Sequence, residues 1–261
     1  MEEPAVLYEV EGSVGTITLN RPAGRNAMTA ELLDAFSAAI EQPRCDQDIR
    51  CLVITGTGRC FSAGADLRSS LQREDLGRPS TEASFAMYEP FLKVLDIEVP
   101  VVAALNGHAV GGGFGLALLA DIRVANADAK YGANFARLGI HSGLGISYVL
   151  PRLVGAAHAS ELLFTGKLIT GSEALQMGLV TYAKDGAEVL PTAMALARSI
   201  AASAPLAVRQ MKSSIRRALG WQIRDAALEE AALQAASLQT EDAKEGVAAI
   251  LEKREPEFRG R

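Results

Sequence analysis

A hydrophobic stretch without any charged residue covers residues 99–120. Its length alone would suit a membrane span, which needs about 20 apolar residues. Pro100 and five internal glycines argue against one continuous helix, because each glycine costs a helix interior about 1 kcal/mol. The stretch divides better into a buried strand, a turn and a buried helix, which we place at residues 101–105, 106–111 and 112–120.

The predicted helix begins inside a glycine cluster, residues 111–113. Glycine lets a backbone amide approach another molecule without a Cβ in the way. The first turn of a helix also offers unpaired N–H donors that carry positive partial charge. The start of this helix is therefore suited to binding an oxyanion or a phosphate.

The N-terminal part of the chain predicts strands that alternate with helices. Two hydrophobic runs separated by Gly12 predict a hairpin of residues 7–10 and 14–19. Thr29 is placed to cap a helix with one apolar face, which Pro43 ends. A strand at 51–55, a polar and mobile surface segment at 69–83 and a helix at 84–96 follow.

The C-terminal part predicts fewer strands and more helix. We expect strands at 122–125 and 130–132, a loop at 139–145, and then a helix that ends near residue 153. Beyond residue 156 the pattern is helical, with turns at 170–171 and 178. These elements indicate an α/β core over residues 1–190 and a helical subdomain over residues 191–261, of the kind that packs against sister subunits.

Composition indicates a soluble globular protein of 261 residues, 49% of them hydrophobic and 22% charged. A net charge of −5 without a basic stripe argues against a nucleic-acid partner. Three cysteines without a CxxC spacing and three histidines without an HExxH motif predict reduced thiols and no metal site. The acidic N-terminus does not have the features of a signal peptide, so we expect a cytoplasmic protein without a membrane partner.

A second segment of small residues, 61–67, follows the strand at 51–55 and precedes a predicted helix. If the strands before the two small-residue loops are parallel neighbours, the loops meet at their carboxyl ends, where α/β sheets bind ligands. Two backbone amides converging there would form an oxyanion hole. By mutational precedent one such donor is worth about 3–4 kcal/mol of transition-state stabilisation.

Five spaced segments carry a more specific pattern: FSAGADL at 61–67, PVVAALNGHAVGGGFGLALLADIRVA at 100–125, LPRLVG at 150–155, TGKLITGSEALQMGLV at 165–180 and EDAKEGVAAILEKREPEFRGR at 241–261. Together they resemble the crotonase, or enoyl-CoA hydratase/isomerase, superfamily over essentially the whole chain. The resemblance implies a crotonase-like α/β fold, a spiral of ββα units with a helical C-terminal trimerisation region. It also implies a homotrimer or a dimer of trimers, an acyl-CoA thioester as ligand, and no cofactor beyond the CoA moiety.

Position by position, the resemblance makes the backbone amides of Ala65 and Gly112 the oxyanion hole, which polarises the thioester carbonyl and stabilises its enolate. Asp66 and Asp121 resemble residues that hold turns, and His108 resembles a scaffold position. For the arginines and the lysine among the implied CoA contacts, a solvated surface role stays open. The implied contacts are Arg25, Ala63, Asp66, Leu67, Arg68 and Lys253, the last reaching the nucleotide bound to a neighbouring subunit.

The chain departs from the family at the residues that move protons. The two glutamates that hydratases of the family use fall at Gly115 and Phe135, and an aspartate used by some isomerases and a dehalogenase falls at Gly143. None of these residues can transfer a proton. No aspartate or glutamate lies between Lys130 and His158, so a shift of the alignment would not restore a carboxylate.

Two other residues could stand near the reacting carbons. His141 lies two residues before Gly143, and its ordinary pKa suits proton transfer at neutral pH, although a lone histidine usually has a structural role. Tyr88 lies in the helix before the core strand, where the family's dehalogenase carries a histidine. His141 is therefore a weak candidate for the proton carrier.

Three functions are compatible with these observations. The first is an enoyl-CoA hydratase or isomerase that keeps the oxyanion hole and uses a different proton carrier. The second is a catalytically silent protein that binds or delivers acyl-CoA, with Phe135 drying the acyl pocket. The third is a dinucleotide-binding unit, although the glycines around residue 111 do not give GxGxxG.

Overall fold

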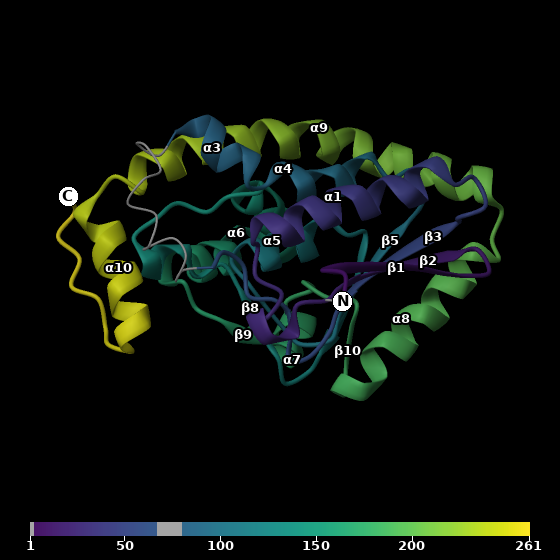
Figure 1. Cartoon of the computed structure of the whole chain (residues 1–261), viewed down its shortest axis with the longest axis horizontal. Coiled ribbons are helices and arrows are strands. Elements are labelled where there is room, and N and C mark those ends of the chain that lie inside the picture. Colours follow the sequence, from purple (N-terminus) through teal and green to yellow (C-terminus); the bar gives the residue numbers. More distant parts are fainter. Residues whose placement is uncertain (1–2, 67–79) are drawn as a thin grey trace.

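The structure is a computed structural model that describes residues 3–66 and 80–261, with the side chains of residues 218–221 excepted. A six-stranded sheet forms its centre, in the order β1-β2-β3-β5-β7-β10 (Figure 1). The first pair is the predicted antiparallel hairpin, and every later pair is parallel. The strands are Val6–Glu11, Val14–Leu19, Cys51–Gly56, Val101–Leu105, Ile122–Asn126 and Tyr182–Lys184.

A second sheet of four short strands has the order β4-β6-β8-β9. Three strands of the large sheet each continue into a strand of the small one, as β3-β4, β5-β6 and β7-β8. After β6 and β8 the chain runs on into a helix, which gives the repeated ββα units of the predicted α/β spiral. The short strands are Cys60–Ser62, His108–Val110, Lys130–Gly132 and Ile169–Thr170.

Helices cover both faces of the large sheet (Figure 1). Helix α8 packs on one face, α1, α4 and α5 lie on the other, and the long α9 runs across the top of the molecule. The helices are α1 Ala30–Cys45, α3 Thr81–Ala86, α4 Glu89–Leu92, α5 Gly112–Leu119, α6 Ile146–Thr165, α7 Gly171–Gln176, α8 Gly186–Ala201, α9 Pro205–Ser237 and α10 Glu241–Glu252. Short 3-10 segments lie at Pro22–Gly24 (η1), Lys93–Asp96 (η2) and Asn134–Leu138 (η3).

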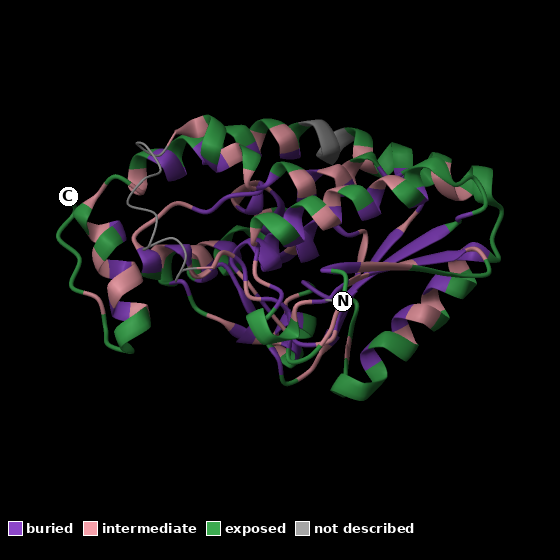
Figure 2. Ribbon diagram, viewed as in Figure 1, coloured by how far each residue is buried: buried purple, intermediate pink, exposed green. Residues whose placement is uncertain are grey.

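The hydrophobic core has two parts, one on each side of the sheet. In the smaller part, alternate residues of β3, β5 and β7 pack against the buried face of α8, which includes Val189, Ala193 and Ala197. The larger part contains α5, whose residues are all buried (Figure 2). Burial on every side explains why this helix is uncharged, and why the same residues resemble a membrane span in the sequence.

Several local predictions are confirmed, and others need correction. Strand β5 and helix α5 begin where predicted, and the Thr29 side chain accepts a hydrogen bond from the amide of Leu32. Pro43 does not end α1, which continues to Cys45, because a proline in the last turn removes few helical bonds. The turn predicted at 106–111 contains strand β6. The sequence does not predict strands β4, β9 and β10, because runs of two or three residues are too short to show the alternation of a strand.

The helix expected at residues 84–96 is divided into α3, α4 and η2. Pro90 stands in the first turn of α4, where its missing N–H leaves no helical bond unmade. The helix that follows the 139–145 loop starts at Ile146, and Gly155, with φ +78°, interrupts it close to its expected end. The surface segment predicted at 69–83 and the helix expected after residue 67 lie largely outside the described residues.

Helix α9 is joined to the core by an ion-pair cluster around Asp121. The Asp121 carboxylate accepts from Lys212 Nζ at 2.9 Å, from Arg216 Nε at 2.9 Å and from the amide of Val101 at 2.8 Å. This carboxylate therefore has the turn-holding role expected of it, because it fixes the start of β5 against α9. The division of the chain at residue 190 stays a prediction, although α8 packs directly on the sheet.

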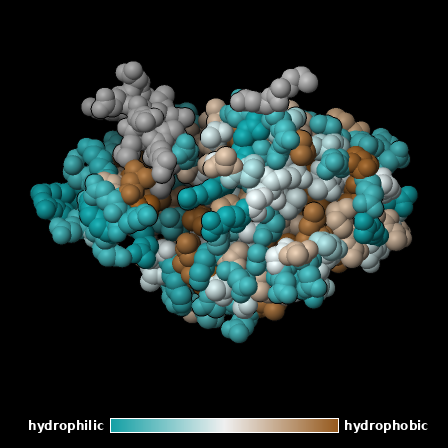
Figure 3. All heavy atoms as spheres, turned by 60° about the horizontal axis from the view of Figure 1, so that its bottom comes forward, coloured by the Kyte–Doolittle hydropathy of each residue, from teal (hydrophilic) through white to brown (hydrophobic). Residues whose placement is uncertain are grey.

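No single helix in the described part of the chain is long and apolar enough to cross a membrane. Helix α8 and the first part of α9 meet the length and composition limits only as a pair bent by 111°. On the face seen in Figure 3, hydrophilic side chains surround small hydrophobic groups. Elsewhere on the surface, large apolar side chains of α6 and α9 are strongly exposed, at Phe164, Leu206, Met211 and Ile215.

Candidate active site

The two small-residue loops lie side by side. Strands β4 and β6, which precede them, are parallel neighbours in the small sheet. A Cβ built on Gly64 would lie 3.1 Å from the backbone nitrogen of Gly112 and 2.6 Å from the carbonyl oxygen of Val110. Only glycine fits at residue 64, because its φ is +78° and the atoms that it faces are backbone.

Gly112 is the first residue of α5, so its amide has no acceptor within the helix. Within residues 3–66 and 80–261, neither this amide nor that of Ala65 donates to a protein acceptor. Gly111, with φ +56°, turns the chain into the helix and donates its own amide to the carbonyl of Gly132 at 3.0 Å. Two donors from distant segments are therefore available beside Gly64.

Backbone bonds from residues 25–28 fix the first of these loops. The amide of Ala63 donates to Arg25 O at 3.0 Å, and the amide of Met28 donates to Gly64 O at 2.9 Å. Arg25 and Asn26 both have positive φ, a conformation that costs a non-glycine residue about 1–3 kcal/mol. Strain of this kind persists where surrounding contacts over-determine the backbone, which is the case here.

Apolar side chains surround the start of α5. A Cβ built on Gly112 would lie 2.3 Å from Met28 Sδ and 3.4 Å from the Tyr88 ring, and one on Gly111 would lie 3.7 Å from Phe135 Cζ. Tyr88 and Phe135 are 2% and 7% exposed. The start of α5, with the free amide of Gly112, therefore lies in surroundings of low polarity, which strengthen its interaction with a developing negative charge.

Close packing surrounds two of the positions that the resemblance aligns with the family's carboxylates. The side chain of Leu144 packs against Gly115, and the phenol ring of Tyr88 packs against Gly143, 2.3 Å from where a Cβ would stand. Burial raises the pKa of Tyr88 well above its ordinary value, so the phenol stays protonated. Its hydroxyl is paired with the Gln234 side chain, and its oxygen lies 2.7 Å from where a Cβ of residue 143 would stand.

Three polar side chains one turn apart on α9 hold the loop at 141–145. Glu230 accepts from the amides of Gly145 and Ser147, each at 2.7 Å. Gln234 donates to the carbonyl of His141 at 3.0 Å, and Ser237 accepts from the amide of the same residue at 3.0 Å. Glu230 thus caps α6 from another helix, since Gly145 offers no side-chain cap.

His141 is partly buried, and its Nδ1 lies 2.9 Å from the carbonyl oxygen of Ser142. A carbonyl can only accept, so Nδ1 carries the proton in this arrangement and Nε2 is left with a lone pair in the neutral ring. The ring is therefore in a tautomer that can take up a proton. The sequence could not show this feature, which depends on the local fold of the loop.

Cations gather beside the first loop. The pKa of His108 is lowered by its burial and by the charges of Arg59, Lys130 and Arg25. His108 Nδ1 accepts from the amide of Lys130 at 2.9 Å, which supports the scaffold role expected of this histidine. The sequence does not single out Arg59 and Lys130, because it is the pairing of β6 with β4 and with β8 that brings them to His108.

The remaining predicted CoA contacts are Asp66, Leu67, Arg68 and Lys253. Leu67 and Arg68 lie outside the described residues, and Asp66 stands at their edge with an interaction partner. Lys253 is exposed and ends α10 in a left-handed conformation. Among the described residues no group of three histidine, cysteine or acidic side chains could hold a metal, and all three cysteines, Cys45, Cys51 and Cys60, are free thiols.

Comparison with known proteins agrees with this geometry. The family model described as "Enoyl-CoA hydratase/isomerase" matches residues 9–261. The chain is 36% identical to the putative enoyl-CoA hydratase/isomerase YngF of Bacillus subtilis (strain 168), over 98% of both chains. It is 35% identical to the short-chain-enoyl-CoA hydratase of Clostridium acetobutylicum, again over 98% of both. The solved structure of EchA1_1 from Mycobacterium paratuberculosis superposes over all of both chains with a TM-score of 0.87 at 35% identity. Fold, loop geometry and sequence agree, and the chain belongs to the enoyl-CoA hydratase/isomerase family.

Proposed function

We propose that the protein binds an acyl-CoA thioester and stabilises its enolate between the amides of Ala65 and Gly112. The observation that carries this proposal is the approach of Gly64 to the Gly112 nitrogen, with both amides free of protein acceptors. Two such donors polarise the thioester carbonyl and make its α carbon more acidic. In hydration, water would lose a proton and add to the β carbon of an enoyl-CoA, which gives the enolate, and a proton would then add to the α carbon; in isomerisation, the enolate would form by loss of a proton and regain it at another carbon.

The CoA portion would lie along the cations beside the first loop. Arg25, Arg59 and Lys130 act together on His108, so their charges overlap in one region, as phosphate recognition requires. Lys253 would reach the nucleotide bound to a neighbouring subunit in a trimer or a dimer of trimers. The exposed apolar side chains of α9, among them Met211 and Ile215, support such an assembly. We expect that the protein uses no cofactor beyond the CoA moiety of its substrate. We also expect it to be cytoplasmic.

The proton carrier cannot be one of the family's carboxylates, since Gly115, Phe135 and Gly143 stand in their places. His141 is our candidate, because its hydrogen bond to Ser142 leaves Nε2 free to accept a proton. A positioned histidine typically contributes about 10²- to 10⁴-fold to a rate.

A second function, a catalytically silent acyl-CoA-binding or delivery protein, is favoured by one observation. Leu144 and Tyr88 pack so closely on Gly115 and Gly143 that a side chain at either position would need its neighbour to shift. A site of this kind would hold an acyl chain in apolar surroundings without converting it.

A panel of CoA esters separates the two functions. Linear, branched and aryl enoyl-CoA esters and their saturated counterparts would be tested for binding by calorimetry and for loss of the conjugated thioester absorbance. S-alkyl-CoA thioethers, which have no carbonyl, serve as controls. Conversion of any ester supports the enzyme, and binding without conversion supports the silent protein. Thioesters that bind no more tightly than thioethers would contradict the oxyanion hole in both.

A further inference from the structure

A buried hydroxyl group lies between the two loops that supply the proposed oxyanion hole. Ser62 is the last residue of β4 and is 0% exposed. Its Oγ donates to the carbonyl of Asn26 at 2.7 Å and accepts from the amide of Gly64 at 3.3 Å. The hydroxyl thus connects the strained 25–28 segment to the residue that precedes Ala65.

Ser62 also contacts the other loop. A Cβ built on Gly113, the second residue of α5, would lie 2.3 Å from Ser62 O, 2.6 Å from Ser62 Cβ and 2.7 Å from Ser62 Oγ. The backbone of α5 therefore packs directly on Ser62, with no side chain between them. Ser62 therefore contacts both the Ala63–Gly64 peptide, through its hydroxyl, and the start of α5.

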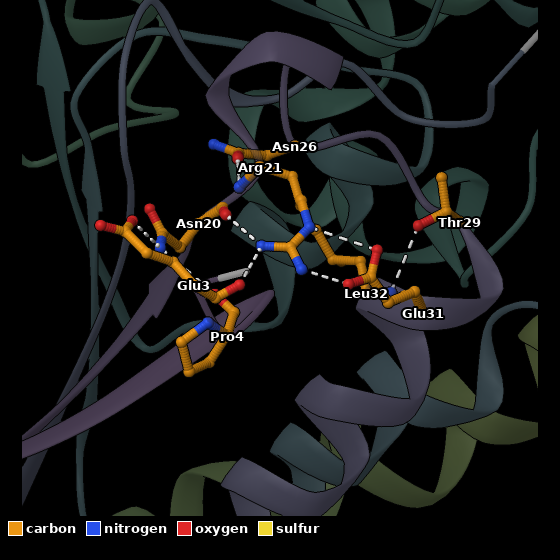
Figure 4. A network of polar contacts seen from close by, with 8 residues as sticks. All are labelled: Glu3, Pro4, Asn20, Arg21, Asn26, Thr29, Glu31 and Leu32. Atoms are coloured by element: carbon orange, nitrogen blue, oxygen red, sulfur yellow. Dashed lines mark hydrogen bonds and ion pairs between the residues drawn. The ribbon is translucent and has the colours of Figure 1, made fainter. Parts of the chain in front are cut away.

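Asn26 holds the acceptor of this hydroxyl in place. Its side chain is 0% exposed and its φ is +51°. Oδ1 accepts from the amide of Arg21 at 2.7 Å, the contact drawn in Figure 4. Nδ2 lies within 3.1 Å of three carbonyl oxygens, those of Thr57, Cys60 and Phe61. The Asn26 backbone is thereby fixed to the end of β4.

Arg21 extends this arrangement to two further segments. Its guanidinium donates to the carbonyl of Glu3 at 2.8 Å and pairs with the carboxylate of Glu31 in the first turn of α1 (Figure 4). The turn that carries Asn26 is consequently held by the segment that precedes β1 and by α1. The Asn26 carbonyl is therefore a fixed acceptor for the Ser62 hydroxyl.

We propose that Ser62 is a positioning residue of the oxyanion hole. Its hydroxyl, held by Asn26, orients the Ala63–Gly64 peptide, and through it the adjacent Gly64–Ala65 peptide, so that the Ala65 amide and the Gly112 amide point at one oxygen. This inference rests on the proposed function and adds the residue that sets the geometry of its central feature. Ser62 acts through the backbone and does not touch the substrate.

Removal of the hydroxyl leaves two buried polar groups without partners, the amide of Gly64 and the carbonyl of Asn26. A buried polar group without a partner is unfavourable, so the Ala63–Gly64 peptide turns to find another acceptor. The Ala65 amide is in the adjacent peptide and turns with it. The thioester still binds through its CoA portion, but its carbonyl loses part of its polarisation.

The test is the absorbance of an arylacryloyl-CoA ester, whose conjugated carbonyl shifts to longer wavelength when it is polarised. We expect a red shift on binding to the wild type. In Ser62→Ala we expect about half of that shift or less, with a Kd within about threefold of wild type. Ser62→Cys, whose thiol is a weaker donor and acceptor, should fall between them.

Thr55→Val is the matched control. Thr55 is a buried hydroxyl, 3% exposed, that donates to the carbonyl of Ala104 at 2.9 Å between β3 and β5. Its loss costs a comparable hydrogen bond away from the loops, so the variant should keep the full red shift. An equal loss in Thr55→Val would show a general effect of destabilisation and overturn the assignment of Ser62.

The two proposals fail in different ways. A wild type that binds the ester without any red shift contradicts the oxyanion hole itself. A wild type with a red shift that Ser62→Ala and Ser62→Cys retain in full contradicts only the role of Ser62. Where a converted substrate is available, Ser62→Ala should lower kcat by about 10- to 100-fold and leave KM nearly unchanged.

Discussion

Leu144 packs directly against Gly115: a Cβ built on residue 115 would lie 2.7 Å from Leu144 Cδ2 and 3.1 Å from its Cβ. Leu144 is 1% exposed and has φ +66°, an unfavourable conformation for a leucine. The chain therefore accepts backbone strain to bury an apolar group beside Gly115, the position that the resemblance aligns with a glutamate of the hydratases. The space that a side chain at residue 115 would need is occupied.

This contact predicts that Gly115→Glu alone will not create a hydratase. The new side chain would press on Leu144 and bury a carboxylate, which should lower the free energy of unfolding by about 2–4 kcal/mol. Denaturant unfolding and enoyl-CoA hydration measure the two effects. Gly115→Glu combined with Leu144→Gly, which removes the clash and suits the positive φ, should recover part of the stability. A fully stable Gly115→Glu would contradict the packing described.

Gly64 provides a sharper test of the loop geometry. Gly64→Ala places a Cβ 2.6 Å from a backbone carbonyl at a φ of +78°, so neither the neighbour nor the residue can adjust. We expect a loss of about 2–3 kcal/mol in unfolding free energy and no red shift of a bound arylacryloyl-CoA. Gly178→Ala has nearly the same φ, +75°, but its Cβ meets only Leu153 O at 3.8 Å. It should lose about 1 kcal/mol and keep the shift.

The sequence allowed the main features of the site to be predicted. The uncharged stretch and its glycines placed β5 and α5, and the second small-residue loop was expected beside the first. Both predictions rest on local signals, namely hydrophobic run length, turn residues and caps. The adjacency of the two loops then follows from the parallel pairing of β4 with β6.

Other features depend on contacts between distant residues, which one sequence does not show. Glu230 caps a helix that begins 84 residues earlier, at Ile146, and the Tyr88 hydroxyl pairs with Gln234. The positive φ of Leu144 has no sequence signal either, since leucine rarely adopts it. Packing of α9 on the start of α6 and on Tyr88 creates the first two of these features.

The cap formed by Glu230 leads to a prediction about stability. Its carboxylate accepts from two amides at the start of α6 and from the hydroxyl of Ser147 at 2.5 Å. Glu230→Gln turns one acceptor into a donor that faces an N–H group, so we expect a loss of about 2–3 kcal/mol in unfolding free energy. Glu229→Gln is the control, because Glu229 is exposed on the same helix and should change stability by less than about 0.5 kcal/mol. Similar losses in both variants would contradict the cap.

The ion-pair cluster around Asp121 leads to a prediction about pH. Burial by itself would raise the pKa of Asp121, but the charges of Lys212 and Arg216 outweigh it and lower the pKa below 3.8. A carboxylate with a lowered folded pKa stabilises the protein above its ordinary pKa, and this stabilisation is lost as the pH falls through the folded value. Asp121→Asn should therefore be less stable than wild type by about 3 kcal/mol at pH 7.

The difference between wild type and Asp121→Asn should narrow as the pH falls below about 4. Urea unfolding at a series of pH values measures it, with Asp34→Asn, an exposed carboxylate of α1, as the control that should follow wild type throughout. A difference that stays constant down to pH 2.5 would show that the charge of Asp121 does not join α9 to the core.

His141 is the last residue to test, because it is the candidate proton carrier of the proposed enzyme. If Nε2 of His141 transfers the proton during catalysis, His141→Ala should lower kcat for a converted enoyl-CoA by about 10²- to 10⁴-fold. The Kd for a saturated acyl-CoA should stay within about threefold of wild type. His158→Ala is the matched control, since this histidine is exposed on α6 and should leave both quantities unchanged. Unchanged turnover in His141→Ala would remove the histidine from the mechanism. The oxyanion hole would stand, because the red shift of a bound arylacryloyl-CoA depends on Ala65 and Gly112 and not on a proton carrier.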